Sequence, residues 1–210
     1  VQVDGTWRTL VDWTPADAIV ANGENRLSVL AQGETITLLI NDIAVAQLHD
    51  QTFAAGGVGL YVETDEENGA TVAFDNFDLW LTAAAEESGV EATTQDDGVD
   101  QAALATTIAA LRETEAGWYD GFRQDTGVWE TPSDDDRTIA IADRELSFAV
   151  NASNLLAISA YTPEEPFASS DYYMEVTGTY VDGEAEGNYG IIFRYVDSKN
   201  FYFFDINNGG

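Results

Sequence analysis

The acidic run ETDEE is the clearest suggestion of catalytic chemistry. Glu63, Asp65 and Glu67 stand at every second position, and on a strand this spacing places side chains on one face. Two carboxylates about 5 Å apart can act as nucleophile and acid/base in a retaining glycoside hydrolase. Asn68-Gly69 follows directly and is a strong turn signal, so Glu67 is expected in the turn. We therefore prefer a solvated acidic hairpin and predict no catalytic residue.

Two oxygen-rich turns are candidates for a cation. The first contains Asp65, Glu66, Glu67 and Asn68, and the second contains three aspartates at 134–136. Ca²⁺ takes six to eight oxygen ligands, and loops of this kind can supply several. The EF-hand spacing and the glycine-aspartate nonapeptide repeat are both missing from the sequence. Ca²⁺ at the first turn is the one cofactor considered, and a diffuse cloud of counter-ions is the alternative.

Aromatic side chains suggest a third kind of site, because they can stack on sugar rings. The candidates are Trp7, Trp13, Trp118, Trp129 and Tyr202, with Arg194 as a hydrogen-bond donor. Aromatic residues in a two-sheet sandwich more often belong to the core. Arg194 lies between apolar neighbours, so it is expected to extend its stem along them or to pair with a buried carboxylate. Glycan binding therefore stays open as one interpretation.

Other catalytic chemistries lack their residues. His49 is the only histidine, and the chain has no cysteine, so there is neither a disulfide framework nor thiol chemistry. The glycine-rich stretch at 56–59 lacks the lysine and the helix of a phosphate-binding loop.

Short strands must position these side chains. Alternating apolar residues predict strands throughout 1–81 and again after 118, separated by turn residues. The predicted strands are 6–13, 25–32, 35–40, 43–48, 56–64, 71–81, 137–142, 145–151, 171–183, 189–197 and 201–206. In the strand 6–13, Trp7 and Trp13 are expected on one side. In 189–197, Tyr195 is expected to share a face with Phe193, and Arg194 to face the other way. The strand 201–206 is apolar on both faces, so it is expected inside a sheet and covered on both sides.

One helix is predicted between the two strand-rich segments. Residues 82–98 are small and acidic and are expected to form a solvated linker. Leu104, Ile108 and Leu111 then recur at helical spacing, which predicts a helix over roughly 100–114 with Asp100 as its N-cap. Its apolar stripe is narrow, so the helix is expected to dock on another element.

The strand motifs resemble a known family in an unusual order. The stretch YGIIFRYVDSKNFYFFDINNGG at 189–210 resembles the middle of a concanavalin A-like (laminin-G/lectin/glucanase) jelly roll of bacterial surface proteins. ENRLSVLAQGETITLLINDIAVAQL, GGVGLYV and VAFDNFDLW, all within 1–81, resemble the second half of that fold. The resemblance covers 1–81 and 140–210, and it implies an all-β concanavalin A-like jelly-roll β-sandwich with its halves reversed.

The reversed order sets the predicted domain organisation. Residues 1–81 form a C-terminal half-sandwich, 82–117 a linker with the helix, and 118–210 an N-terminal half-sandwich. Three arrangements stay open: a window cut from a tandem array, a permutant closed on itself, and halves completed by neighbouring copies. Half a sandwich leaves strand edges and apolar faces uncovered, so we favour head-to-tail assembly of copies. The predicted assembly interface is Val1, Val3, Trp7, Leu10, Phe201, Phe203, Phe204 and Ile206.

Charge limits the partners. Asp and Glu number 38 against 8 Lys and Arg, which gives a formal net charge of −30. This field repels nucleic acid and anionic membranes, and no apolar run is long enough to insert into a bilayer. The charge suits a cation-rich or high-salt medium that screens the self-repulsion, and the near absence of lysine adds weight to high salt or to an extracellular or cell-surface setting, of which we predict the latter. We therefore predict a non-catalytic structural or adhesive module that assembles with copies of itself into a filament or repeat array. A carbohydrate-binding, lectin-like module that binds surface glycans is the alternative, and a glycoside hydrolase using Glu63 and Glu67 is a weaker one.

Overall fold

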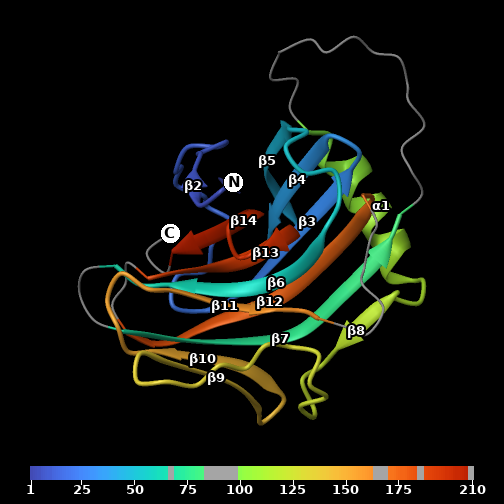
Figure 1. The fold of residues 1–210 in the computed structure, drawn as a ribbon. Helices are drawn as coiled ribbons and strands as arrows, with labels where there is room; N and C mark the ends of the chain where they lie inside the picture. Colours follow the sequence, from blue (N-terminus) through green and yellow to red (C-terminus); the bar gives the residue numbers. More distant parts are fainter. Residues whose placement is uncertain (66–68, 83–98, 163–169, 184–186, 208–210) are drawn as a thin grey trace.

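Two antiparallel β-sheets packed face to face, with one helix on the outside, make up the fold (Figure 1). The computed structural model describes residues 1–65, 69–82, 99–162, 170–183 and 187–207. Within these residues the chain is an all-β sandwich, as the sequence predicted. No helix in these ranges has the length and apolar character needed to cross a membrane.

The smaller sheet has six strands in the order β11-β6-β13-β14-β1-β2. Its strands are β11 (Leu156–Ala160), β6 (Gly57–Glu63), β13 (Asn188–Asp197), β14 (Asn200–Asn207), β1 (Gln2–Val3) and β2 (Thr6–Trp7). Strand β6 comes from the first half of the chain, yet it pairs on both sides with strands of the second half.

The larger sheet has eight strands, seven of them in the order β5-β4-β3-β12-β7-β10-β9, while β8 pairs with β7. Its strands are β5 (Ile43–His49), β4 (Thr35–Ile40), β3 (Glu24–Gln32), β12 (Tyr172–Gly183), β7 (Ala70–Leu81), β10 (Glu145–Val150), β9 (Arg137–Ala142) and β8 (Trp118–Asp120). Here β12 from the second half lies between β3 and β7 from the first half.

The two half-sandwiches therefore complete each other within one chain. Gln2 of β1 pairs with Phe201 of β14, which joins the two ends of the chain in one sheet. Among the residues predicted to join neighbouring copies, Val1, Phe201, Phe204 and Ile206 are buried inside this chain; Val3, Leu10 and Phe203 are partly buried and Trp7 is exposed. Within the described residues, strands from both halves of the chain are paired with each other in each sheet. Assembly of copies stays a prediction, but the uncovered edges that motivated it are paired here.

Local turn signals were predicted correctly. Asn41-Asp42 joins β4 to β5 with φ of 50° and 69°, and Asp143-Arg144 joins β9 to β10 with φ of 54° and 72°. Two successive left-handed residues are typical of the type I′ hairpin, whose twist matches that of paired strands. Gly33 has a φ of 56° in the β3–β4 turn, where glycine adopts this conformation without strain.

The strand predicted over 6–13 is wrong beyond Trp7. Only Thr6–Trp7 pairs, and residues 8–23 run irregularly across the open edge of the sandwich. The backbone of Arg8 still exchanges hydrogen bonds with Val1, at 2.9 and 2.8 Å, while its guanidinium donates to Asp50 at 2.6 Å and to Thr52 at 2.7 Å. The alternating pattern of residues 9–13 therefore did not make a strand here.

A β-bulge reverses the predicted faces at the end of β13. The register between β13 and β14 shifts after Phe193, and Arg194 has a φ of 47°. An extra residue of this kind moves the following side chains to the other face. Arg194 is therefore fully buried, and Tyr195 lies against Phe201 with ring centroids 6.0 Å apart. The prediction that Tyr195 shares a face with Phe193 is wrong for this reason.

The helix was predicted correctly. Helix α1 spans Gln101–Arg112, and the Asp100 carboxylate caps it by accepting from the amides of Ala102 and Ala103. Ile108 is buried against Leu30, Leu39, Trp80 and Tyr173. The helix thus docks its apolar stripe on the outer face of the eight-stranded sheet (Figure 1).

Strand β14 is covered on both faces, as its sequence predicted. Tyr202, Phe204 and Ile206 belong to the main core between the sheets. Phe201 and Phe203 belong to a separate cluster with Tyr61 and Ile192 on the outer face of the six-stranded sheet. Asp205 follows these two on the same face by alternation, so one carboxylate is placed beside an aromatic cluster.

Candidate functional site

The outer face of the six-stranded sheet has a pocket of about 210 Å³ that combines carboxylates with tryptophans. We call it the Asp205 pocket. It is lined by Trp7, Arg8, Thr9, Trp13, Tyr61, Glu63, Leu156, Asn188, Phe201, Phe203 and Asp205. Glu63, Trp7 and Trp13 were candidates from the sequence, and the fold brings the three to one place.

Strand register places Tyr61 and Asp205 on either side of β13, next to the Asp205 pocket. Gly190 of β13 is paired with Tyr61 on one side and with Asp205 on the other. A Cβ atom at Gly190 would lie 2.0 Å from the Phe204 carbonyl oxygen, so only glycine fits. Without a side chain between them, the Tyr61 hydroxyl and the Asp205 carboxyl can interact across β13.

Two carboxyl groups in the Asp205 pocket have raised pKa values. Burial, and then the charge of Glu63, raises the pKa of Asp205 to about 6, although the Tyr61 hydroxyl and the α-ammonium of Val1 act in the opposite direction. Burial and the charge of Asp65 raise the pKa of Glu63, which Asn188 partly offsets by hydrogen bonding. Each carboxylate is thus costly to ionise where it stands.

Neither carboxylate has a basic side chain to neutralise it. Within the described residues there are five ion pairs, and none includes Glu63 or Asp205. Arg8 lines the pocket, but its guanidinium is bound to Asp50. The pocket is therefore a place of negative potential that a cation or a hydrogen-bond donor could satisfy.

The Tyr61 hydroxyl is a further polar group at this place. Tyr61 is 1% exposed, and burial together with Asp205 holds the pKa of its hydroxyl well above the usual value. The contact with Asp205 does not reach hydrogen-bond geometry, and in the described part of the chain the hydroxyl has no other partner. A buried hydroxyl without a well-formed hydrogen bond is unfavourable, unless a ligand or water completes it.

Two tryptophans border the Asp205 pocket. Trp7 is 47% exposed and Trp13 is 63% exposed. The Trp7 ring is held edge-on by Phe203 and Phe201, with centroids 5.0 and 5.9 Å away. A fixed ring that is half open to solvent offers an apolar surface at little entropic cost.

The other aromatic candidates lie elsewhere. Tyr202 is 1% exposed, stacks on Phe193 with centroids 5.2 Å apart and donates its hydroxyl to Asp50. Trp129 is buried and donates its indole N–H to Asp120 at 3.0 Å, and Trp118 is half-buried in β8. These side chains serve the core, so Tyr202 in particular has almost no surface left for a sugar.

Arg194 is also a core residue. Its guanidinium donates to the carbonyl oxygens of Phe53 at 3.0 Å and Ser170 at 3.2 Å, and also to that of Gly33. It therefore ties together chain segments at the end of the sandwich and does not face a ligand, because the bulge turns it inward.

The predicted calcium turn lies mostly outside the described residues, which include Asp65 but not Glu66, Glu67 or Asn68. In the second acidic turn, Asp134 accepts from the backbone amides of Asp136 and Arg137, both at 3.0 Å. Among the residues that the structure describes, no three acidic, histidine or cysteine side chains are grouped to hold a metal ion.

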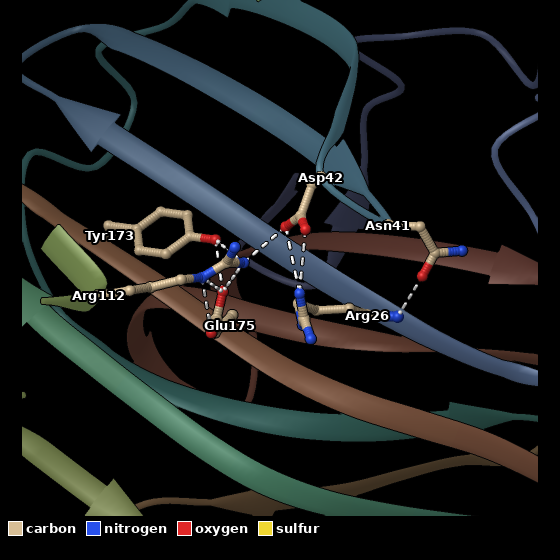
Figure 2. Close-up of polar contacts among 6 residues, drawn as sticks. All are labelled: Arg26, Asn41, Asp42, Arg112, Tyr173 and Glu175. Carbon is tan, nitrogen blue, oxygen red and sulfur yellow. Dashed lines mark hydrogen bonds and ion pairs between the residues drawn. The ribbon is translucent and has the colours of Figure 1, made fainter. Parts of the chain in front are cut away.

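A second polar cluster lies on the outer face of the eight-stranded sheet, and we call it the Arg112 cluster. Figure 2 shows the Arg112 guanidinium between Glu175 and Asp42, at 2.5 and 2.6 Å. The Tyr173 hydroxyl donates to Glu175 at 2.6 Å, and Arg26 pairs with Asp42 at 3.1 Å. The two arginines hold the pKa of Asp42 below its usual value against the effect of burial. These contacts join α1 to β12 and to the β4–β5 turn, so the cluster has a structural role.

A wider apolar groove of about 710 Å³ runs between β5 and β14, beneath residues 9–19. Its walls include Leu48, Ile43 and Ile206, and it shares Trp13 and Asp205 with the Asp205 pocket. The groove marks the open edge of the sandwich next to the candidate site.

Comparison with known proteins does not assign the site. No protein-family model matches the chain, and no curated protein matches it. The case for a function therefore depends on the geometry of the Asp205 pocket.

Sequence reasoning missed Asp205, Asn188, Arg8 and Tyr61. One signal could have indicated Asp205, because it is the only acidic residue in the apolar strand FYFFDI. Asn188 and Tyr61 gain their position from strand register, and the Arg8 guanidinium is held by Asp50 and Thr52; the sequence displays neither.

Proposed function

We propose that the chain is a concanavalin A-like jelly-roll module that binds carbohydrate, without catalysis, in the Asp205 pocket. The observation that carries this proposal is the exposed pair Trp7 and Trp13 beside half-buried Glu63 and Asp205. Binding sites commonly combine aromatic walls with a few convergent polar groups that fix orientation. Sugar rings present apolar C–H faces and hydroxyl donors, which match these two kinds of group.

An extracellular setting belongs to the proposal, since surface glycans would be the partners. The net charge of −30 is compatible with a soluble surface module. Head-to-tail assembly of copies is a separate proposal, and the paired strand ends in this chain give it less physical motivation than the sequence did.

Glycoside hydrolysis is the second candidate because of one observation. Asp205 has a pKa of about 6, and Glu63 lies in the same pocket. A carboxyl group with a raised pKa beside a second carboxylate is the arrangement that glycosidases use for acid catalysis. In this form Asp205 takes the place that the sequence hypothesis gave to Glu67.

Titration calorimetry against a panel of soluble oligosaccharides tests the proposed function. We expect at least one neutral or basic oligosaccharide to bind, and Trp13→Ala to weaken it about tenfold, which corresponds to about 1.4 kcal/mol. Tyr119→Ala is the matched control, because Tyr119 is 56% exposed on β8 of the other sheet, and it should bind like the wild type.

Failure of the whole panel, or unchanged binding by Trp13→Ala, would overturn the proposal. Chromatography of the same mixtures after prolonged incubation separates the two candidates. Shortened oligosaccharides that disappear with Asp205→Asn would replace the binding module by a hydrolase.

A further inference from the structure

We infer that the glycan bound in the Asp205 pocket carries free amino groups, and that Glu63 and Asp205 bind its ammonium groups. This inference rests on the proposed function and names its substrate class. The charge, the accessible polar groups and the aromatic border of the pocket support the inference.

The pocket brings two partly buried carboxylates together. The groups that face its carboxylates are Tyr61 and Glu63 from β6, Asn188 from β13, Asp205 from β14, Arg8 after β2 and the α-ammonium of Val1. Arg8 is already held by Asp50 and Thr52, and the Val1 ammonium donates to the Arg8 carbonyl at 2.8 Å. Two carboxylates thus face a ligand with little neutralising charge, and a protonated amine supplies both the charge and the hydrogen-bond donors that they lack.

The accessible polar groups limit how that amine can bind. The Tyr61 hydroxyl is buried without a well-formed hydrogen bond, so a ligand meets the carboxylates of Glu63 and Asp205, which line the pocket, and not this oxygen. An ammonium has three donors, so it can serve both carboxylates at once.

The aromatic border favours the same ligand. The faces of indole rings attract cations as well as apolar surfaces. Trp7 and Trp13 therefore suit a sugar whose ring carries an ammonium better than one that carries only hydroxyl groups. Glycans with carboxylate or sulfate groups are disfavoured, because the pocket and the net charge of −30 both repel them.

Three oligosaccharides of equal length and linkage separate the possibilities. Oligomers of glucosamine, N-acetylglucosamine and glucose, all β-1,4-linked, differ only in an amine, an acetamide or a hydroxyl at the second carbon. Calorimetry is done at about pH 7, above the pKa of Asp205. We expect the glucosamine oligomer to bind at least tenfold more tightly than either of the others.

Two variants and one control locate the effect. Asp205→Asn and Glu63→Gln should each remove most of the preference for the amine and leave the two neutral oligomers little changed. Asp143→Asn removes the same charge in the β9–β10 turn of the other sheet, and it should keep the preference. Thermal unfolding of each variant confirms that a loss of binding is not a loss of fold.

Each contrary outcome has its own meaning. Equal or tighter binding of the neutral oligomers would overturn the amino-sugar inference and leave the proposed function standing. If Asp143→Asn weakened binding as much as Asp205→Asn, the amine would be attracted by the net charge and not by the pocket, which would also overturn the inference. No binding of any oligomer, or of the wider panel, would defeat the proposed function itself.

Discussion

The outer faces of the two sheets carry carboxylates in contrasting states. In the Arg112 cluster, Glu175 and Asp42 are paired with arginines and lie beside α1. In the Asp205 pocket, Glu63 and Asp205 form no ion pair with a basic side chain of the described residues and lie beside exposed tryptophans. On one face these carboxylates are paired with arginines and stabilise the fold. On the other face they lack an ion-pair partner among the described residues.

In a very acidic chain, burial together with the presence or absence of an ion pair distinguishes structural carboxylates from those that could bind a ligand. The chain has only 8 Lys and Arg for 38 Asp and Glu, so most carboxylates must lack a partner. On the exposed surface this costs little, since water and salt screen the charges. Inside a half-buried pocket the cost is appreciable, so Asp205 lowers stability where it stands, and such a cost is typical of functional sites.

The largest effect is expected from breaking the Arg112 cluster. Arg112→Ala leaves Glu175, which is 8% exposed, without its positive partner, and removing one member of such a pair costs about 3 kcal/mol. Urea unfolding at neutral pH measures the loss in free energy of unfolding. A loss below that of an ordinary surface substitution would contradict the structural role of this cluster.

In the Asp205 pocket, removing a charge is expected to raise the free energy of unfolding, whereas Arg112→Ala lowers it. The folded-state pKa of about 6 lies above the usual aspartate value of 3.8, so the folded protein binds the proton more tightly than the unfolded chain does. Its contribution to stability is complete below about pH 4 and is lost as pH rises through about 6. Asp205→Asn should therefore raise the free energy of unfolding at pH 8 by about 3 kcal/mol.

Unfolding titrations of wild type and Asp205→Asn across this pH range measure the difference directly. The difference between the two should close towards pH 4, where the carboxyl is protonated in both states. Because Asp78 also has a pKa raised to about 6 by burial and by Glu175, only the difference between the two proteins, and not the wild-type curve, reports on Asp205. A variant less stable than wild type at pH 8 would show that its carboxylate is satisfied after all.

A smaller effect is expected in the pH dependence of binding. The affinity of the wild type relative to that of Asp205→Asn should fall about tenfold between pH 7 and pH 5, as Asp205 takes up a proton. Calorimetry of both proteins at each pH tests this, because the amine of the glucosamine oligomer also takes up protons over this range and affects both profiles equally. Parallel profiles would assign the pH dependence to another group.

The smallest effect is expected at the exposed end of the Arg112 cluster. The Arg26–Asp42 pair has side chains 41% and 44% exposed, and such pairs contribute about 0.5 kcal/mol. Arg26→Ala should lower the free energy of unfolding by no more than this, in the same urea experiment. A loss in free energy of unfolding equal to that of Arg112→Ala would mean that the difference in burial does not determine how much each arginine contributes to stability.

Features encoded within a few residues were predictable. The turns at Asn41-Asp42 and Asp143-Arg144 and the helix capped by Asp100 were all confirmed. Each depends on local backbone conformation and short-range hydrogen bonds, which a sequence displays directly. Part of the site was also visible, since Glu63, Trp7 and Trp13 were candidates before the fold was known.

Features that depend on distant partners were not predictable. Residues 6–13 alternate like a strand, yet pairing with the N-terminal segment ends at Arg8. The bulge that buries Arg194 and exposes Tyr195 to the outer cluster depends on the register of β13. Asp205 is recognisable as a site residue only from the pairing of β13 with β6 and β14.

The sequence by itself determined alternating strands, their tight turns, one capped helix and an acidic surface, because these follow from propensities and charges of nearby residues. Only the tertiary structure decided that the two halves close on each other within one chain. It also decided which carboxylates meet an arginine and which stay without one. The physical reason is that strand pairing and ion pairing join residues far apart in the chain, and their choice depends on burial that no local pattern records.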